Sequence, residues 1–192
     1  MPDALKATMN LLDAQQSVLL IVDMQTRLLA AMQPDDAAAL LDNTLKLLTA
    51  ARLLHVPVLL SEQYPRGLGL TADVIQTVLS ANTIRFEKTV FSCCGNPAFH
   101  QALLAGGRRQ VIIAGLEAHV CVLQTAFELL QQGYQVYVVE DAVCSRLNRH
   151  KANALLRMQQ AGVVNICHES VLFEWLRDAG HADFKTLSAL VK

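Results

Sequence analysis

The sequence predicts a three-layer α/β fold, in which helices cover both faces of a doubly wound, six-stranded and mostly parallel sheet. Two observations carry this prediction. Short, continuously apolar runs such as Ser17–Val22 are typical of strands that are buried on both faces. These runs alternate along the chain with segments of helical periodicity, and strict alternation of strand and helix favours right-handed βαβ units and a parallel sheet.

Six strands are expected, at residues 17–22, 58–60, 83–86, 111–114, 134–139 and 163–166. Helices are expected from Gln25 onward and at residues 36–54, 71–79, 96–104, 120–132, 149–160, 170–177 and 184–191. Pro57 ends the long second helix, Gly133 is suited to a helix C-terminus, and residues 61–69 are expected to form a loop. Without a linker or repeat, residues 1–192 are predicted to form a single Rossmann-like domain.

Composition narrows the classes of function. Hydrophobic residues make up 53% of the 192 residues, which implies a large core, and the formal net charge is −1. Such a balance offers no basic surface for nucleic acid or an anionic membrane, so the expected partner is a small molecule. The apolar composition and the family resemblance described below also suggest a homo-oligomer.

Targeting signals and cofactor motifs are not evident in the sequence. No run reaches the roughly 18–20 apolar residues of a membrane span, and Met1–Asn10 carries no readable secretory signal. The five cysteines do not resemble a disulfide framework or paired zinc knuckles, so they are read as reduced. A cytoplasmic protein without a metal or other cofactor is expected.

Polar side chains follow the predicted strands at one end of the sheet. In doubly wound sheets, ligands bind outside the carboxyl ends of the strands, at the point where the strand order reverses. An acid, an amine and a thiol are therefore expected to meet there, together with other polar residues. The residues at this rim are Asp23, Gln25, residues 62–64, Glu87, Lys88, residues 117–121 and Asp141.

Cys121, Asp23 and Lys88 suit nucleophilic catalysis. Cys121 would start a helix, where free N–H groups and the dipole favour a thiolate and can hold an oxyanion. Asp23 could take the thiol proton, and Lys88 could orient that carboxylate and offset its charge. The plainer alternatives are a core cysteine, a helix-capping aspartate and a solvated lysine.

Three motifs in order resemble the isochorismatase-like cysteine hydrolases: residues 22–25 (VDMQ), 87–92 (EKTVFS) and 115–122 (GLEAHVCV). The resemblance extends from about Ser17 to Ile166, and residues 62–69 are most similar to the subgroup of isochorismatase domain-containing proteins. It implies a catalytic triad of Asp23, Lys88 and Cys121.

The resemblance also implies a cis peptide between Leu116 and Glu117, which would form an oxyanion hole from the N–H groups of Glu117 and Cys121. The metal-binding cluster of the nicotinamidase branch is not matched, because residues 61–65 contain no histidine. Isochorismatase proper is described as lacking the cysteine that is present here. The resemblance therefore favours metal-independent hydrolysis of an amide or related C–N bond through an acyl-enzyme.

Several further residues are candidates for the substrate pocket. The alternative interpretation is that they are solvated loop residues or belong to a turn. His119 could instead act as the base for Cys121, and Glu117, His119 and Cys121 could hold zinc on an extended segment. The predicted substrate-binding residues are Gln25, Glu62, Gln63, Tyr64, Phe91 and His119.

Two other classes of function stay open at this stage. The chain could be a catalytically silent interaction or scaffold protein that keeps the fold. It could also be a thiol redox protein, in which Cys121 forms a disulfide with a neighbouring cysteine.

Overall fold

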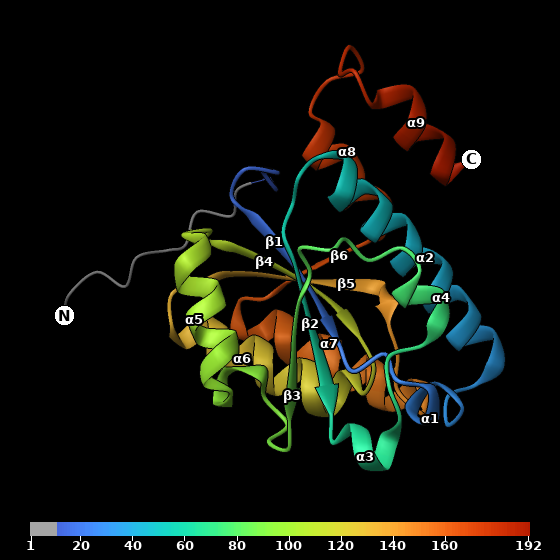
Figure 1. Cartoon of the computed structure of the whole chain (residues 1–192), viewed down its shortest axis with the longest axis vertical. Coiled ribbons are helices and arrows are strands. Elements are labelled where there is room, and N and C mark those ends of the chain that lie inside the picture. The colour runs from blue at the N-terminus through green and yellow to red at the C-terminus, as the bar shows by residue number, and fades with distance from the viewer. Residues whose placement is uncertain (1–10) are drawn as a thin grey trace.

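The computed structural model describes residues 11–192 and contains one six-stranded, entirely parallel sheet (Figure 1). Met1–Asn10, where the absence of a secretory signal was predicted, lie outside the described residues. The strand order is β3-β2-β1-β4-β5-β6, so the order reverses between β1 and β4. The strands are β1 (Ser17–Val22), β2 (Val58–Gln63), β3 (Ile84–Lys88), β4 (Gln110–Gly115), β5 (Gln135–Val143) and β6 (Val164–Ile166).

Side-chain alternation along the strands divides the core into two halves. In β1, Leu19 and Ile21 point to one face, whereas Val18, Leu20 and Val22 point to the other, and all five are buried. Because both faces are covered, every residue of β1 and β4 is buried, as the apolar runs predict.

Helices from different parts of the chain cover the two faces. The first face packs against α2 (Pro34–Leu53), α4 (Asp73–Gln76), α8 (His168–Leu176) and α9 (Phe184–Ser188). The second face packs against α5 (Pro97–Gly106), α6 (Leu123–Gln131) and α7 (Asn148–Ala161). In Figure 1, α2 and α4 lie to the right of the sheet and α5 to the left. The predicted three-layer architecture is therefore confirmed.

Element boundaries differ from the prediction mainly near the carboxyl end of the sheet. β2 and β3 run on to Gln63 and Lys88, so residues that were expected in loops belong to strands. The expected loop at 61–69 contains a short helix, α3 (Pro65–Leu68), and the expected helix at 71–79 shortens to α4. The carboxyl ends of these strands are hard to recognise in the sequence, because β3 (IRFEK) carries charged residues and β2 ends in the polar residues SEQ. In the structure, β2 and β3 are extended by pairing with each other.

The remaining elements are short. A helix α1 (Thr26–Leu29) follows β1, and 3-10 turns occupy Cys93–Gly95 and Ala189–Val191. A π-helical turn, Ala118–Val122, precedes α6 and continues directly into it. None of the helices between residues 11 and 192 is long and apolar enough to cross a membrane.

Candidate active site

Asp23 and Lys88 form a fully buried ion pair at the carboxyl ends of β1 and β3. Lys88 Nζ lies 2.7 Å from Asp23 Oδ2, and both side chains are 0% exposed. Burial lowers the pKa of Lys88, but the charge of Asp23, the two nearby cysteines (Cys121 and Cys93) and the hydrogen bond to Asp23 together more than offset this, so the pKa lies above its ordinary value. Lys88 is therefore an ammonium group paired with the Asp23 carboxylate.

Two side chains from β2 hold this pair in place. Ser61 Oγ donates a hydrogen bond of 2.7 Å to Asp23 Oδ1, and Lys88 Nζ donates one of 2.6 Å to Gln63 Oε1. Ser61 reaches Asp23 because β2 pairs with β1 in the register Val22↔Ser61, and the Asp23 N–H also donates to the Ser61 carbonyl. The strand between β1 and β3 thus orients both charges of the ion pair.

Cys121 lies beside the ion pair, in the π-helical turn that begins after β4. Its side chain is buried, with the residue 5% exposed, and it forms a side-chain hydrogen bond with Asp23. Thr125 Oγ1, one turn further along, donates a hydrogen bond of 2.7 Å to the Cys121 carbonyl. The structure therefore brings together the three residues that the sequence placed at the rim.

The ionisation of Cys121 differs from the sequence-based expectation. A position at the start of a helix predicts a lowered thiol pKa, yet burial and then the negative charge of Asp23 raise it above the ordinary value. The Lys88 ammonium acts in the opposite direction without overcoming them. In the free protein the thiol is protonated, so Asp23 is the group positioned to remove its proton.

The predicted cis peptide is absent, because the bond between Leu116 and Glu117 is trans. The chain turns at this point in another way: Glu117 adopts a left-handed conformation with φ 53°, and the Ala118 N–H donates to the carbonyl of Cys144 on the loop after β5. The expectation of an oxyanion hole created by that cis bond is therefore corrected. N–H donors for an oxyanion would therefore come from the helical turn that contains Cys121.

Gly115 is required where β4 gives way to the Cys121 turn. A Cβ atom at this position would lie 2.3 Å from the carbonyl oxygen of Val22 and 2.6 Å from its Cβ. Glycine thus allows β4 to approach the end of β1, which brings Cys121 close to Asp23.

Gln25 and Glu62, two predicted substrate-binding residues, are buried and bonded within the protein. The Gln25 amide donates to the carbonyls of Gln63 and Gly69 and accepts from the Gln63 N–H. One carboxylate oxygen of Glu62 accepts from both the N–H and the hydroxyl of Thr71. Both side chains therefore hold the chain around residues 69–71 against the end of β2.

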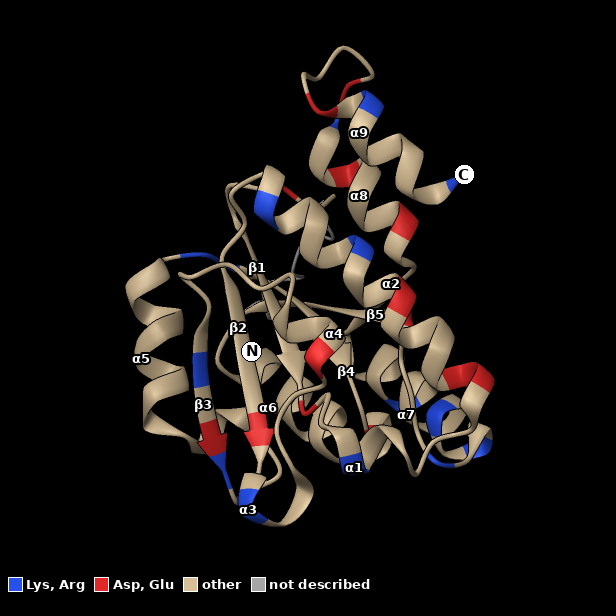
Figure 2. Cartoon of the chain, turned by 45° about the vertical axis from the view of Figure 1, so that its right-hand side comes forward, with Lys and Arg blue, Asp and Glu red and all other residues tan. Residues whose placement is uncertain are grey.

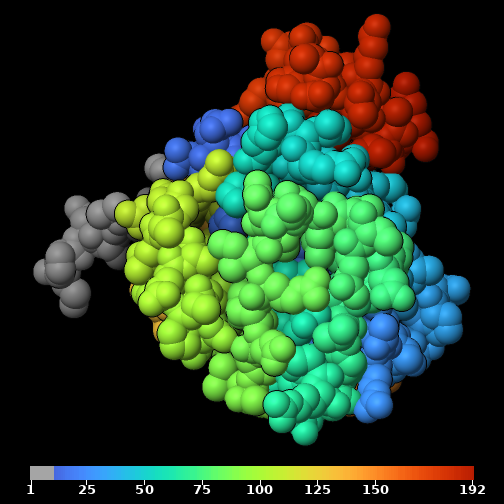
Figure 3. Space-filling model, in the orientation of Figure 1, coloured from blue at the N-terminus to red at the C-terminus, as the bar shows by residue number. Residues whose placement is uncertain are grey.

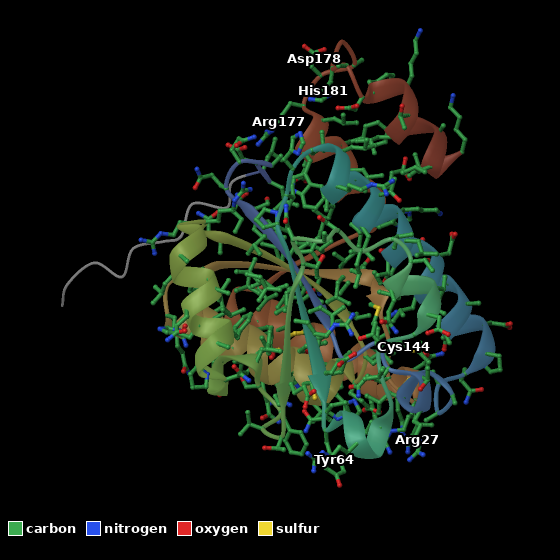
Figure 4. The ribbon with its side chains drawn as sticks, viewed as in Figure 1. Arg27, Tyr64, Cys144, Arg177, Asp178 and His181 are labelled. Carbon is green, nitrogen blue, oxygen red and sulfur yellow. The ribbon has the colours of Figure 1, made fainter. Side chains whose placement is uncertain are left out.

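Tyr64 and Phe91 are more accessible, with 55% and 52% of their surfaces exposed. Tyr64 lines an open cavity of about 390 Å³ with Pro65, Arg66, Glu87, Lys88 and Thr89. Figure 4 shows Tyr64 near α3, at the same end of the molecule as Arg27, which donates to the carbonyl of Gly67. Acidic residues mark the tips of β2 and β3 beside this cavity (Figure 2).

His119 belongs to a polar cluster on the β5 side of Cys121. Its Nδ1 lies 3.0 Å from Ser145 Oγ and 3.5 Å from Glu117 Oε2, and Glu117 also pairs with Arg146 at 2.7 Å. The His119 ring packs against His150. Burial lowers the pKa of His119 despite the nearby Glu117 carboxylate, which favours the neutral imidazole at neutral pH.

The triad has three neighbours that the sequence did not predict: Ser61, Thr125 and Cys93. Cys93 is fully buried and lies close enough to Asp23 and Lys88 for both charges to affect its pKa. The Cys93 N–H donates to the same Thr125 hydroxyl that bonds to Cys121. Only the polar position of Ser61 at the end of a buried strand was a usable signal in the sequence.

Asp141 lies within β5 and acts at a helix terminus. Its carboxylate accepts from the N–H of His168, the first residue of α8, and pairs with the His168 ring at 2.7 Å. Among residues 11–192, no group of three His, Cys, Asp or Glu side chains is arranged to hold a metal ion. Glu117, His119 and Cys121 therefore do not form the zinc site that was considered as an alternative.

Comparison with known proteins identifies the family. The isochorismatase domain model matches residues 17–170. Mouse isochorismatase domain-containing protein 2A is 37% identical over 195 residues, which cover 98% of this chain and 89% of the mouse protein.

Solved structures agree with this assignment. A Caenorhabditis elegans protein described as MAR1 ribonuclease is 34% identical with a TM-score of 0.89, covering 95% of this chain and 92% of that protein. The Escherichia coli YcaC gene product, described as an octameric hydrolase of unknown specificity, is 29% identical with a TM-score of 0.84. That match covers 93% of this chain and 88% of the bacterial chain. The chain therefore belongs to the isochorismatase-like hydrolase family.

Proposed function

We propose that the protein is a cysteine-dependent hydrolase that cleaves a C–N bond in a small amide-like substrate through a covalent acyl-enzyme at Cys121. The observation that carries this proposal is the buried Asp23–Lys88 ion pair, whose carboxylate is hydrogen-bonded to the Cys121 thiol. A purely structural cysteine has no need of a buried carboxylate and ammonium, which are costly to desolvate.

The first half of the reaction transfers the acyl group to sulfur. Asp23 takes the thiol proton as Cys121 Sγ forms a bond to the substrate carbonyl carbon, and Lys88 remains protonated beside both developing anions. The C–N bond then breaks, and the proton on Asp23 passes to the leaving amine. The product of this half is a thioester at Cys121 and a free amine.

The second half returns the enzyme to its starting state. Asp23, again a carboxylate, removes a proton from water as the water oxygen attacks the thioester carbonyl. The C–S bond breaks, the acid is released, and the proton returns to Cys121. We assign oxyanion stabilisation in both halves to N–H groups in the turn around Cys121, with Glu117 and Cys121 themselves as the candidate donors.

Substrate recognition is assigned to the accessible residues around the triad. Tyr64 and Phe91 are proposed to form walls of the pocket, with His119 on the β5 side; Gln25, Glu62 and Gln63 are proposed to shape the pocket from behind. No metal or other cofactor enters this scheme, because the carboxylate and ammonium supply the base and the charge.

Assembly and cellular location belong to the same proposal. A homo-oligomer is supported by the octameric state described for the E. coli relative. A reducing, cytoplasmic location is supported by the five cysteines, all of which are free.

The test is a parallel screen of small amides, carbamoyl compounds and esters, with an RNA oligonucleotide as a further arm. Wild type, Cys121→Ala and the control Cys167→Ala are compared in each arm. We expect turnover of a C–N substrate by wild type and Cys167→Ala, a loss of at least about a thousandfold in Cys121→Ala, and an acyl adduct on Cys121 by intact-mass analysis.

Four outcomes would contradict the proposal. Turnover that persists in Cys121→Ala would show that Cys121 is not the nucleophile. Turnover confined to RNA would show that the substrate is not a small amide. A Cys121 that stays unlabelled by acyl and alkylating reagents, in a protein without turnover, would favour the scaffold alternative. Ready formation of a disulfide by Cys121 on mild oxidation would favour the redox alternative.

A further inference from the structure

Two adjoining cavities lie at the opposite end of the sheet from Cys121. The first has a volume of about 250 Å³ and the second about 280 Å³. Their walls include Val18, Val58 and Ile84, which stand at or next to the first residues of β1, β2 and β3. Asp23 follows β1 and Lys88 ends β3 at the other ends of these strands, and Cys121 comes after the carboxyl end of β4, so these cavities are separate from the candidate active site.

The cavities share four lining residues and therefore lie side by side: Pro57, Val58, Asn82 and Arg108. Figure 3 shows the surface hollowed where α5, in yellow-green, faces the green chain that leads into β3. Small-molecule sites usually begin at about 300 Å³, so a ligand of ordinary metabolite size would occupy both cavities.

The first cavity has a basic lining. Arg52, His55 and Arg108 contribute to its wall, and no carboxylate does. Within residues 11–192, the Arg52 side chain forms no ion pair or hydrogen bond, so its guanidinium is free to bind a ligand. Lys and Arg are also drawn in blue at the C-terminal end of α2 and after α5 in Figure 2.

Arg108 is held in place for such a role. One of its nitrogens donates to the carbonyls of Ala14 and Ser17, which anchors the side chain below β1. Burial lowers the pKa of Arg108, although the negative charge of Asp13, which lines neither cavity, acts in the opposite direction. A bound anion would place a negative charge on the cavity side of this guanidinium.

Thr83 provides an independent indication of a ligand. Thr83 lines the first cavity, and its hydroxyl oxygen is buried without a hydrogen-bond partner in the described part of the chain. Buried polar groups in folded proteins are nearly always hydrogen-bonded, so an unpartnered hydroxyl on a residue of this basic wall calls for an acceptor. An anion bound between the arginines would accept that hydrogen bond.

The second cavity is apolar apart from the shared residues. Leu59 and Ile84 line it from the sheet, and Ala102, Leu103 and Ala105 line it from α5. The small side chains on α5 leave the space open. A hydrocarbon group of a few carbons would be desolvated there, at about 0.8 kcal/mol for each buried CH₂.

We propose that the two cavities form one binding site for a small amphipathic anion, namely a carboxylate with an aliphatic tail. The carboxylate binds beside Arg52, His55, Arg108 and the Thr83 hydroxyl, and the tail lies against α5 and the start of β3. This proposal does not depend on the proposed hydrolase activity, since no residue of the triad contributes to the site.

The test measures binding of hexanoate by isothermal titration calorimetry, with acetate and 1-hexanol as probes that each lack one half of the ligand. All titrations use the Cys121→Ala protein, so that the candidate active site has no nucleophile. Hexanoate is expected to bind with 1:1 stoichiometry, and at least about tenfold more tightly than either acetate or 1-hexanol.

Variants then locate the site. The double variant Arg52→Gln/His55→Gln alters two exposed residues and should weaken hexanoate binding at least about tenfold while leaving 1-hexanol binding unchanged. Ala102→Phe, which fills the apolar cavity, should weaken both hexanoate and 1-hexanol, and the control Arg157→Gln on α7 should weaken neither.

The proposal is overturned if hexanoate shows no saturable binding up to 20 mM (about 2 kcal/mol at the 1 M standard state). Equal binding by Arg52→Gln/His55→Gln and by its parent would also overturn it. If Ala102→Phe fails to fold by circular dichroism, the double variant alone still decides the outcome.

Discussion

Replacing Lys88 by methionine tests the role of the buried ion pair in both stability and chemistry. The change removes the ammonium but keeps an unbranched chain, so it leaves the Asp23 carboxylate buried with only uncharged partners such as Ser61. At 2.7 Å the Coulomb attraction is about 6 kcal/mol for an effective dielectric constant of 20, before desolvation is subtracted. Removing one partner of such a pair typically costs about 3–5 kcal/mol.

The double variant Asp23→Asn/Lys88→Met separates the charge effect from packing. Both charges are removed together, so the free energy of unfolding should return to within about 2 kcal/mol of wild type, although activity stays absent. Lys46→Met is the matched control, because Lys46 pairs with Asp42 at a similar distance of 2.8 Å but on the surface. That control should cost less than about 1 kcal/mol.

Urea denaturation at pH 7, with turnover measured in parallel, decides between these expectations. A stabilising role of the Lys88 charge is refuted if Lys88→Met lowers the free energy of unfolding by less than about 1 kcal/mol, or if the double variant is less stable than Lys88→Met. A catalytically active Lys88→Met protein would refute the role of the ammonium in the reaction.

Three further predictions follow from single positions. Gly115→Ala should destabilise the protein by about 3 kcal/mol, because the new Cβ meets Val22 backbone atoms, whereas Gly106→Ala, with nothing within 4 Å, should be neutral or slightly stabilising in the same denaturation assay. Burial raises the pKa of Cys93 to about 11 from an ordinary 9.0, so above pH 9 the unfolded chain loses a proton that the folded chain keeps. Stability should therefore fall by about 1.4 kcal/mol for each pH unit from pH 9 to 11, and Cys93→Ala should lack this part of the slope. Ser61→Ala removes a hydrogen bond to the Asp23 carboxylate and should cost about 1.5–3 kcal/mol of stability. The kcat of this variant should fall at least tenfold, whereas Thr49→Ala, which removes a part-buried hydroxyl on α2, should leave kcat unchanged.

The sequence by itself determined the architecture and the three residues that meet. Apolar runs such as Ser17–Val22 mark strands whose two faces are both buried, and such runs can be recognised without any tertiary information. Parallel strands place their carboxyl ends on one rim, so Asp23, Lys88 and Cys121 were expected together, and the family motifs supported the same set. Those expectations depend on local pattern and topology, which a linear sequence records.

Strand lengths and the partners of the triad were decided by tertiary structure. β2 continues through Ser61, Glu62 and Gln63 because β1 and β3 pair with it on either side, although these polar residues resemble a loop in isolation. Register then places Ser61 opposite Val22 and brings its hydroxyl to Asp23, a contact between residues 38 positions apart. No local signal in the sequence encodes that pairing.

The ionisation of Cys121 shows the same division most clearly. Its place at the start of a helical segment is a local property, and taken alone it favours a thiolate. Burial against the sheet and the adjacent charge of Asp23 arise only when distant segments pack together, and they raise the pKa instead. Pattern and spacing thus determined which residues meet at the rim, whereas desolvation and charge proximity, which exist only in the packed structure, decided the protonation state of the Cys121 thiol.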